Sequence, residues 1–139
     1  MIIYKSKFLE VNLLELQYTF HFFWSEYARH MDEEGVYYES LRFLNHRVRR
    51  RADQIYLDWR NIQHLISPET FQWYAQYIFP SLFSYRGRRL AILFNELPAW
   101  DMPNIIQINN KDIQIQIFTK SANLMQWLLE DSRRKKYKH

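Results

Sequence analysis

The sequence contains no cysteine and only two glycines among its 139 residues. The lack of cysteine excludes disulfide bonds, thiol nucleophiles and thiolate metal sites, and it fits a reducing compartment. The two glycines, Gly35 and Gly87, stand far apart, so neither a G-x-G-x-x-G fingerprint nor a Walker phosphate-binding loop can be present. No apolar run approaches the roughly 18 residues of a membrane span. We therefore expect a soluble, cytoplasmic protein.

The composition is that of one folded domain. Apolar residues make up 47% of the chain and aromatic residues 18%, whereas disordered chains are poor in both. Although the net charge is +4, five of the 19 Lys and Arg residues lie within the last seven positions, 133–139. Without them, 14 basic residues face 15 acidic ones, so the excess charge belongs to the terminus. We predict a single domain over residues 1–132, followed by a basic, solvated tail over 133–139.

The pattern of apolar residues predicts the strands. Closely spaced apolar runs at residues 2–4, 9–16 and 18–24 indicate an antiparallel meander. In the third run, one face is formed by Tyr18, Phe20, Phe22 and Trp24. Buried strands are expected at 55–59 and 90–94, and a half-buried strand near a sheet edge is expected at 113–117.

Helical patterns alternate with the later strands. Over residues 31–51, helical spacing predicts an inward stripe made of Tyr37, Leu41, Leu44 and Val48. Ser67 as N-cap and Pro68 at the first helical position predict a second helix, with Pro80 bending or ending it. Its buried stripe is Phe71, Ala75 and Ile78. A short helix is expected near 102–108.

A last helix should begin at Ser121, with an inward face of Leu124, Met125, Leu128 and Leu129. The order β-β-β-α-β-α-β-(α)-β-α predicts an α/β fold. Its sheet is mixed, with an antiparallel N-terminal meander followed by β-α-β units, and the helices pack on the sheet.

The sequence gives little support to catalysis or metal binding. Asp58, His64 and Ser67 lie close together in the chain, but a triad needs a hydrogen-bonded relay and an oxyanion hole, and Ser67 is not in a G-x-S-x-G elbow. Asp58 is better explained as a strand-end anchor and Ser67 as a helix cap. Metal-ligand spacing is also missing from the histidines, which are His21, His30, His46, His64 and His139. We predict no enzyme, no metal and no cofactor.

A basic contact face is predicted on the helix over 31–51. It lies away from Leu41 and Leu44 and consists of Arg42, His46, Arg49 and Arg50. Such a face could contact an acidic partner, a membrane surface or nucleic acid. The alternative is an ordinary solvated face, because charges normally occupy the exposed side of an amphipathic helix.

Exposed aromatic residues form a second predicted contact surface. Trp73, Tyr74 and Tyr77 lie on the helix after Ser67, and Trp100 lies in a proline-flanked loop. Because Tyr and Trp are enriched in interfaces, these rings could contact a partner or a second copy of the chain. The alternative is that they pack sideways onto neighbouring helices.

Roughly residues 2–130 resemble the SpoIIAA-like, STAS-type bacterial domains. The likeness rests on the segments IYLDWR, NIQHLI, SPETFQW, RRLAILF and LMQWLLE. In STAS anti-sigma-factor antagonists, a strand ending in Asp leads to a phosphorylatable serine at a helix N-terminus, and Asp58 and Ser67 stand at those positions. The residues around Ser67 depart from the antagonist pattern, and Glu69 would repel a phosphate there. The looser, mostly uncharacterised relatives look closer.

The resemblance and the missing catalytic motifs predict a non-catalytic regulatory or protein-interaction module. Its contact or switch residues would be Asp58, Ser67, Trp73 and Tyr77, and its protein partner is unknown. One alternative, by analogy at the level of the fold, is a small apolar or lipid-like ligand bound near Trp73 and Trp100. A second alternative is binding of nucleic acid or an acidic partner through the basic face and tail, with nucleic acid ranked below a protein partner.

Overall fold

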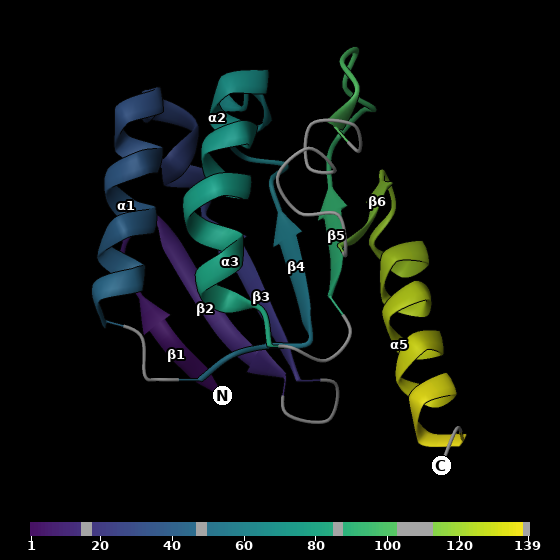
Figure 1. Cartoon of the computed structure of the whole chain (residues 1–139). Coiled ribbons are helices and arrows are strands. Elements are labelled where there is room, and N and C mark those ends of the chain that lie inside the picture. Colours follow the sequence, from purple (N-terminus) through teal and green to yellow (C-terminus); the bar gives the residue numbers. More distant parts are fainter. Residues whose placement is uncertain (15–17, 47–49, 85–87, 103–112, 138–139) are drawn as a thin grey trace.

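A six-stranded sheet forms the centre of the computed structural model, which describes residues 1–14, 18–46, 50–84, 88–102 and 113–137, the last seven by their backbone alone. The strands are β1 (Ile2–Lys5), β2 (Leu9–Leu14), β3 (Thr19–Trp24), β4 (Gln54–Asp58), β5 (Arg89–Leu93) and β6 (Gln114–Phe118). Their order in the sheet is the same as their order in the chain. β1, β2 and β3 pair antiparallel, and β3 to β6 pair parallel (Figure 1). The predicted α/β fold with a mixed sheet is confirmed.

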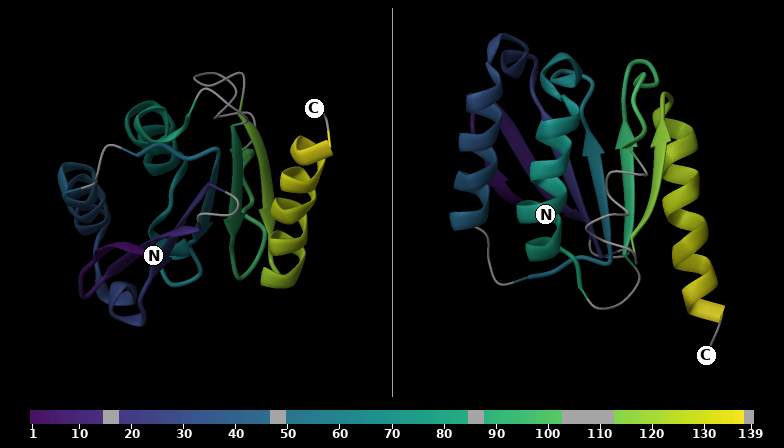
Figure 2. Two further views of the ribbon diagram at one scale, coloured as in Figure 1. Left: turned by 90° about the horizontal axis from the view of Figure 1, so that it is seen from below. Right: turned by 45° about the horizontal axis from the view of Figure 1, so that its top comes forward.

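Helices cover the two faces of the sheet unequally. They are η2 (Glu26–His30, 3-10), α1 (Glu33–His46), η3 (Gln63–Leu65, 3-10), α2 (Pro68–Trp73), η4 (Tyr74–Ile78, a π-helical turn), α3 (Phe79–Leu82) and α5 (Ser121–Tyr137). α1, α2 and α3 lie on one side, and α5 lies on the other beside β5 and β6 (Figure 2). No helix in the described part of the chain is both long and apolar enough to cross a membrane.

The core is divided by the sheet because successive strand residues point to opposite faces. In β4, Ile55 and Leu57 join the large core under α1, α2 and α3. Tyr56 joins a smaller core under α5, together with Leu124 and Leu128 of that helix. This double burial explains why all five residues of β4 are buried, as predicted for a strand covered on both faces.

α2, η4 and α3 follow one another as a continuous helical segment. The predicted cap is confirmed, since the Ser67 side chain accepts a hydrogen bond from the Thr70 amide at 3.2 Å. The predicted stripe is also confirmed, because Phe71, Ala75 and Ile78 are buried. Pro80 has no amide hydrogen to donate, and the wider π turn precedes it. The segment passes through Pro80 and ends at Leu82.

The stripe predicted on α1 is shifted by about one residue from the buried one, although Leu44 is partly buried and packs against the core. Val36 and Phe43 are buried, together with Glu39 and Ser40, whereas Leu41 is 43% exposed and Val48 lies outside the described residues. The shift arises because the two buried polar side chains have partners on other elements. Glu39 accepts hydrogen bonds from Tyr4 and Ser6, and Ser40 is hydrogen-bonded to Tyr74.

Three further predictions are changed at element ends. Tyr18 is exposed with φ 47° and precedes β3, so it does not share the buried face of Phe20. On α5, Leu129 is 38% exposed and was wrongly placed inward. Residues 133–137 continue the α5 backbone, so the boundary predicted after residue 132 falls inside this helix. The helix predicted near 102–108 lies outside the described residues except for Met102.

Candidate functional site

Asp58 ends β4 at the edge where ligands commonly bind in α/β proteins, but its carboxylate is already bound. It is 4% exposed and accepts hydrogen bonds from Arg60 Nη2 at 2.8 Å and Nε at 3.0 Å. The hydrogen bond to Asp58 raises the pKa of Arg60 above its ordinary value. This bidentate geometry orients the loop that follows β4.

Ser67 is held in a cluster of hydroxyl groups around one carboxylate. Its Oγ lies 3.3 Å from Glu33 Oε1, to which Thr70 Oγ1 also donates. Tyr37 Oη lies 3.4 Å from the same oxygen. Because Glu33 is acidic, a phosphate on Ser67 would meet like charge at close range. The geometry therefore favours the structural role of Ser67 over a phosphorylation switch.

The structure does not join Asp58, His64 and Ser67 into a relay. Asp58 binds Arg60, Ser67 binds Thr70 and Glu33, and His64 Nε2 lies 3.1 Å from the Arg29 carbonyl oxygen. Each of these three described side chains is therefore hydrogen-bonded to a different part of the structure and not to the other two. No group of three His, Asp or Glu side chains within the described ranges is arranged to hold a metal ion.

Amides, which the sequence analysis did not single out, fasten the loops at this edge of the sheet. Asn61 Nδ2 donates to the Trp24 carbonyl at 2.8 Å, and Arg29 Nε donates to Asn61 Oδ1 at 2.7 Å. Gln63 Oε1 accepts from the Asn95 amide at 2.8 Å. Asn61 and Gln63, which stand two residues apart in the N-I-Q-H loop, were the available signal, because amide side chains commonly bind loop backbone.

An exposed apolar patch lies between α1 and α2, and we call it the aromatic surface. It consists of Tyr37, Leu41, Trp73 and Tyr77. The Trp73 ring meets the Tyr37 ring edge-on, with centroids 4.5 Å apart, and lies 6.2 Å from the Tyr77 ring. Trp73 is partly buried and Tyr77 is 55% exposed. Leu41 lies one turn after Tyr37 on the same flank of α1.

The predicted aromatic residues differ in their exposure and packing. Trp73 packs sideways onto α1, as the alternative proposed, while Tyr77 presents its ring to solvent. Tyr74 is buried in the core. Trp100 packs on Phe71, with ring centroids 5.7 Å apart.

The predicted basic contact face lies on the other flank of α1. Arg42 and His46 are exposed on α1, and Arg49 lies outside the described residues. Arg50 is exposed too, but α1 ends at His46, so the predicted place of Arg50 on this helix is wrong. The His46 ring is 6.3 Å from the Tyr4 ring of β1, and its Nδ1 is 2.9 Å from the Arg42 carbonyl oxygen. The face is thus turned toward β1, whereas the aromatic surface is turned toward α2.

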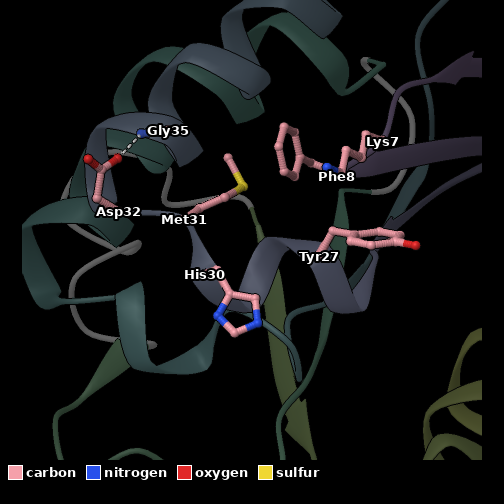
Figure 3. Close-up of a pocket in the computed structure, with 7 residues that line it drawn as sticks. All are labelled: Lys7, Phe8, Tyr27, His30, Met31, Asp32 and Gly35. Atoms are coloured by element: carbon pink, nitrogen blue, oxygen red, sulfur yellow. Dashed lines mark hydrogen bonds between the residues drawn. The ribbon is translucent and has the colours of Figure 1, made fainter.

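A groove that the sequence analysis missed opens beside the start of α1 (Figure 3). Its volume is about 510 Å³ and its lining comes from the β1–β2 turn, η2 and the first turn of α1. The lining residues are Lys7, Phe8, Tyr27, His30, Met31, Asp32 and Gly35. Because Lys7 and Phe8 come from the first hairpin and the other five residues from the stretch 27–35, no local motif could have revealed the groove.

Comparisons with protein-family models, with curated proteins and with solved structures found no match for this chain. The α/β fold stated above rests on the strand pairing and helix positions alone. The resemblance to STAS-type domains is carried by sequence segments alone.

Proposed function

We propose that this chain is a non-catalytic, STAS-like protein-interaction module that binds a partner through the aromatic surface. The observation that carries the proposal is the exposure of Tyr77 and Leu41 beside the partly buried Trp73. Tyr and Trp rings with one buried edge provide large contact areas at low conformational cost. Trp73 is already oriented by Tyr37, so little ordering is required on binding.

The positions of the other predicted contact residues support this choice. Asp58 is bound by Arg60, and Ser67 is bound by Thr70 and Glu33. These polar groups serve the loop and the helix start, which leaves Trp73 and Tyr77 as the contact residues. The same geometry supports a non-catalytic role, since Asp58, His64 and Ser67 do not form a relay.

Arg42 follows Leu41 in α1, where the aromatic surface gives way to the basic flank, and its charge bears on the kind of partner. Arg42 is exposed on α1 next to Leu41, and His46 and Arg50 are exposed farther along the chain. A symmetric dimer that joins the aromatic surfaces of two copies would bring the Arg42 side chains of both copies to the same interface. A different protein, whose contact surface has an apolar centre and acidic residues at its border, would contact both the aromatic rings and Arg42.

Site-specific photo-crosslinking tests this proposal. A photoreactive phenylalanine analogue replaces Tyr77 in one variant and Tyr18, another exposed tyrosine, in a second. After irradiation in cells of the source organism, we expect a discrete adduct from position 77 alone. Leu41→Lys should abolish this adduct, because it places a charge in the apolar contact surface. Since Leu41 is exposed, the substitution should leave the core unaltered.

Three outcomes would contradict the proposal. Identical adducts from positions 77 and 18 would show unspecific capture. An adduct with twice the mass of the chain would assign the surface to a homodimer. An adduct that survives Leu41→Lys and Trp73→Ala unchanged would place the contact outside the aromatic surface.

A further inference from the structure

The groove beside the start of α1 combines an apolar lining with a positioned positive charge. Phe8, Tyr27 and Met31 supply two rings and a thioether, and the cavity of about 510 Å³ lies within the size range of small-ligand sites. Figure 3 shows Met31 between Phe8 on one side and Asp32 on the other, with Tyr27 and His30 below. These side chains leave room for a molecule with an apolar body.

Lys7 is the charged group available to a ligand. Its Nζ lies 5.0 Å from the centre of the Tyr27 ring and 5.9 Å from that of Phe8. Such contacts hold an ammonium group in place without neutralising it. Among the described residues, ion pairs join Lys5 to Glu10 and Arg60 to Asp58, and Lys7 takes part in neither.

Asp32 has a different role at the other end of the groove. Its Oδ1 accepts a hydrogen bond from the Gly35 amide at 2.8 Å, which caps the first turn of α1. The helix N-terminus stabilises this carboxylate. A second negative charge on a ligand would be repelled at this end, whereas a single one at Lys7 is attracted.

From this arrangement we propose that the groove binds a small monocarboxylate with an apolar body. The carboxylate pairs with Lys7, and the body lies against Phe8, Tyr27 and Met31. The site is separate from the aromatic surface, so the proposal does not depend on the proposed function. The proposed ligand is a small molecule and not the C-terminus of a peptide.

Gly35 provides a way to alter the groove without altering its charge. A Cβ at this position would stand 2.8 Å from the Met31 Cε and 3.3 Å from the Asp32 Oδ1. Since that methyl group ends a flexible side chain, Gly35→Ala should displace it and reshape the groove. Alanine also favours a helix more than glycine does. A loss of binding in this variant would therefore not come from unfolding of α1.

The test uses 4-phenylbutyrate as probe and NMR of the full chain labelled with 13C at the methionine methyl groups. The sequence has four methionines, so Met1, Met102 and Met125 are internal references for Met31. We expect a saturable shift of the Met31 signal. Lys7→Gln should weaken binding about tenfold, the effect of losing one charge-assisted contact. Gly35→Ala should weaken it as well.

Matched controls complete the experiment. Lys5→Gln removes the same charge from the same hairpin and should leave the affinity unchanged. The neutral analogue 4-phenylbutyramide should bind about as weakly as the acid binds to the Lys7→Gln variant. No saturable shift at Met31, equal binding of acid and amide, or indifference to Lys7→Gln would overturn the proposal. Tighter binding of a tetrapeptide ending in phenylalanine would assign the groove to peptides and overturn the small-molecule assignment.

Discussion

The imidazole of His21 stacks on the phenol ring of Tyr56, with centroids 4.1 Å apart and ring planes inclined by 24°. The two residues face each other across the parallel pair β3 and β4, on the side of the sheet that carries α5. Burial lowers the pKa of His21, an effect that the Asp58 and Glu10 carboxylates partly oppose. Burial also raises the pKa of Tyr56, with a further contribution from Asp58.

Because burial lowers the pKa of His21, we expect the free energy of unfolding to depend on pH below neutrality. A histidine with a lowered pKa in the folded state takes up its proton more readily in the unfolded chain. The free energy of unfolding should therefore fall as the pH drops below about 6.5, the ordinary pKa of histidine. Urea unfolding between neutral and mildly acidic pH measures this effect. His21→Phe should flatten the dependence, and His30→Gln, at an exposed position, should leave it unchanged.

A second prediction concerns the hydroxyl cluster around Glu33. Ser67→Ala removes the helix cap and should lower the free energy of unfolding by about 1 kcal/mol. Ser67→Asp supplies an equally favoured cap but places a carboxylate beside Glu33, whose Oε1 lies 3.3 Å from the Ser67 Oγ. We expect Ser67→Asp to be at least as destabilising as Ser67→Ala, as measured by urea denaturation.

The double variant Ser67→Asp/Glu33→Gln isolates the repulsion. It should be more stable than Ser67→Asp alone, after correction for Glu33→Gln by itself, and added salt should narrow the difference. A Ser67→Asp variant as stable as the parent chain would refute the argument. That result would also return Ser67 to consideration as a phosphorylation site.

A third prediction addresses the loop after β4. Arg60→Met leaves the buried Asp58 carboxylate without its bidentate partner, and this should cost about 1–3 kcal/mol of unfolding free energy. The matched control is Arg42→Met, an exposed position where surface substitutions usually change stability by less than about 0.5 kcal/mol. Equal effects of the two substitutions would show that the Asp58–Arg60 pair contributes nothing to stability.

A fourth prediction concerns the attachment of α5. Arg89 is 7% exposed, donates to the Trp127 carbonyl at 3.0 Å and stacks 3.5 Å above the Trp127 ring. Buried contacts of this kind contribute about 2 kcal/mol. Arg89→Leu should therefore lower amide exchange protection in α5 while α1 remains protected. Arg88→Leu is the neighbouring control, and equal protection in both variants would contradict this role of Arg89.

Local patterns were enough to predict most of the fold. β4 was predicted from its apolar run, and the start of α2 from Ser67 and Pro68, because caps and buried strands depend on neighbouring residues in the chain. The stripe on α1 was misplaced for the opposite reason. Glu39 and Ser40 are buried by partners on β1, the β1–β2 turn and η4, and helical periodicity contains no information about those elements.

The candidate sites, like the fold, could be predicted from sequence only where they depend on local patterns. Trp73 and Tyr77 could be predicted as contact residues because aromatic residues are conspicuous in sequence, but their different exposures depend on where α1 lies. The groove could not be predicted, since Lys7, Tyr27 and Met31 meet only after η2 and α1 pack beside the first hairpin. The positions of Lys7 and Asp32 at the groove therefore depend on the folded structure and cannot be read from neighbouring residues in the sequence.

The agreement between strand order and chain order has a consequence for synthesis in the cell. Each strand pairs only with strands that directly precede or follow it in sequence, so no strand has to be inserted between two others that are already paired. The sheet can grow at one edge as the chain leaves the ribosome, starting from the β1–β3 meander and adding β4, β5 and β6 in turn. β6 and α5 complete the structure last, and until they arrive the growing edge of the nascent chain is β5.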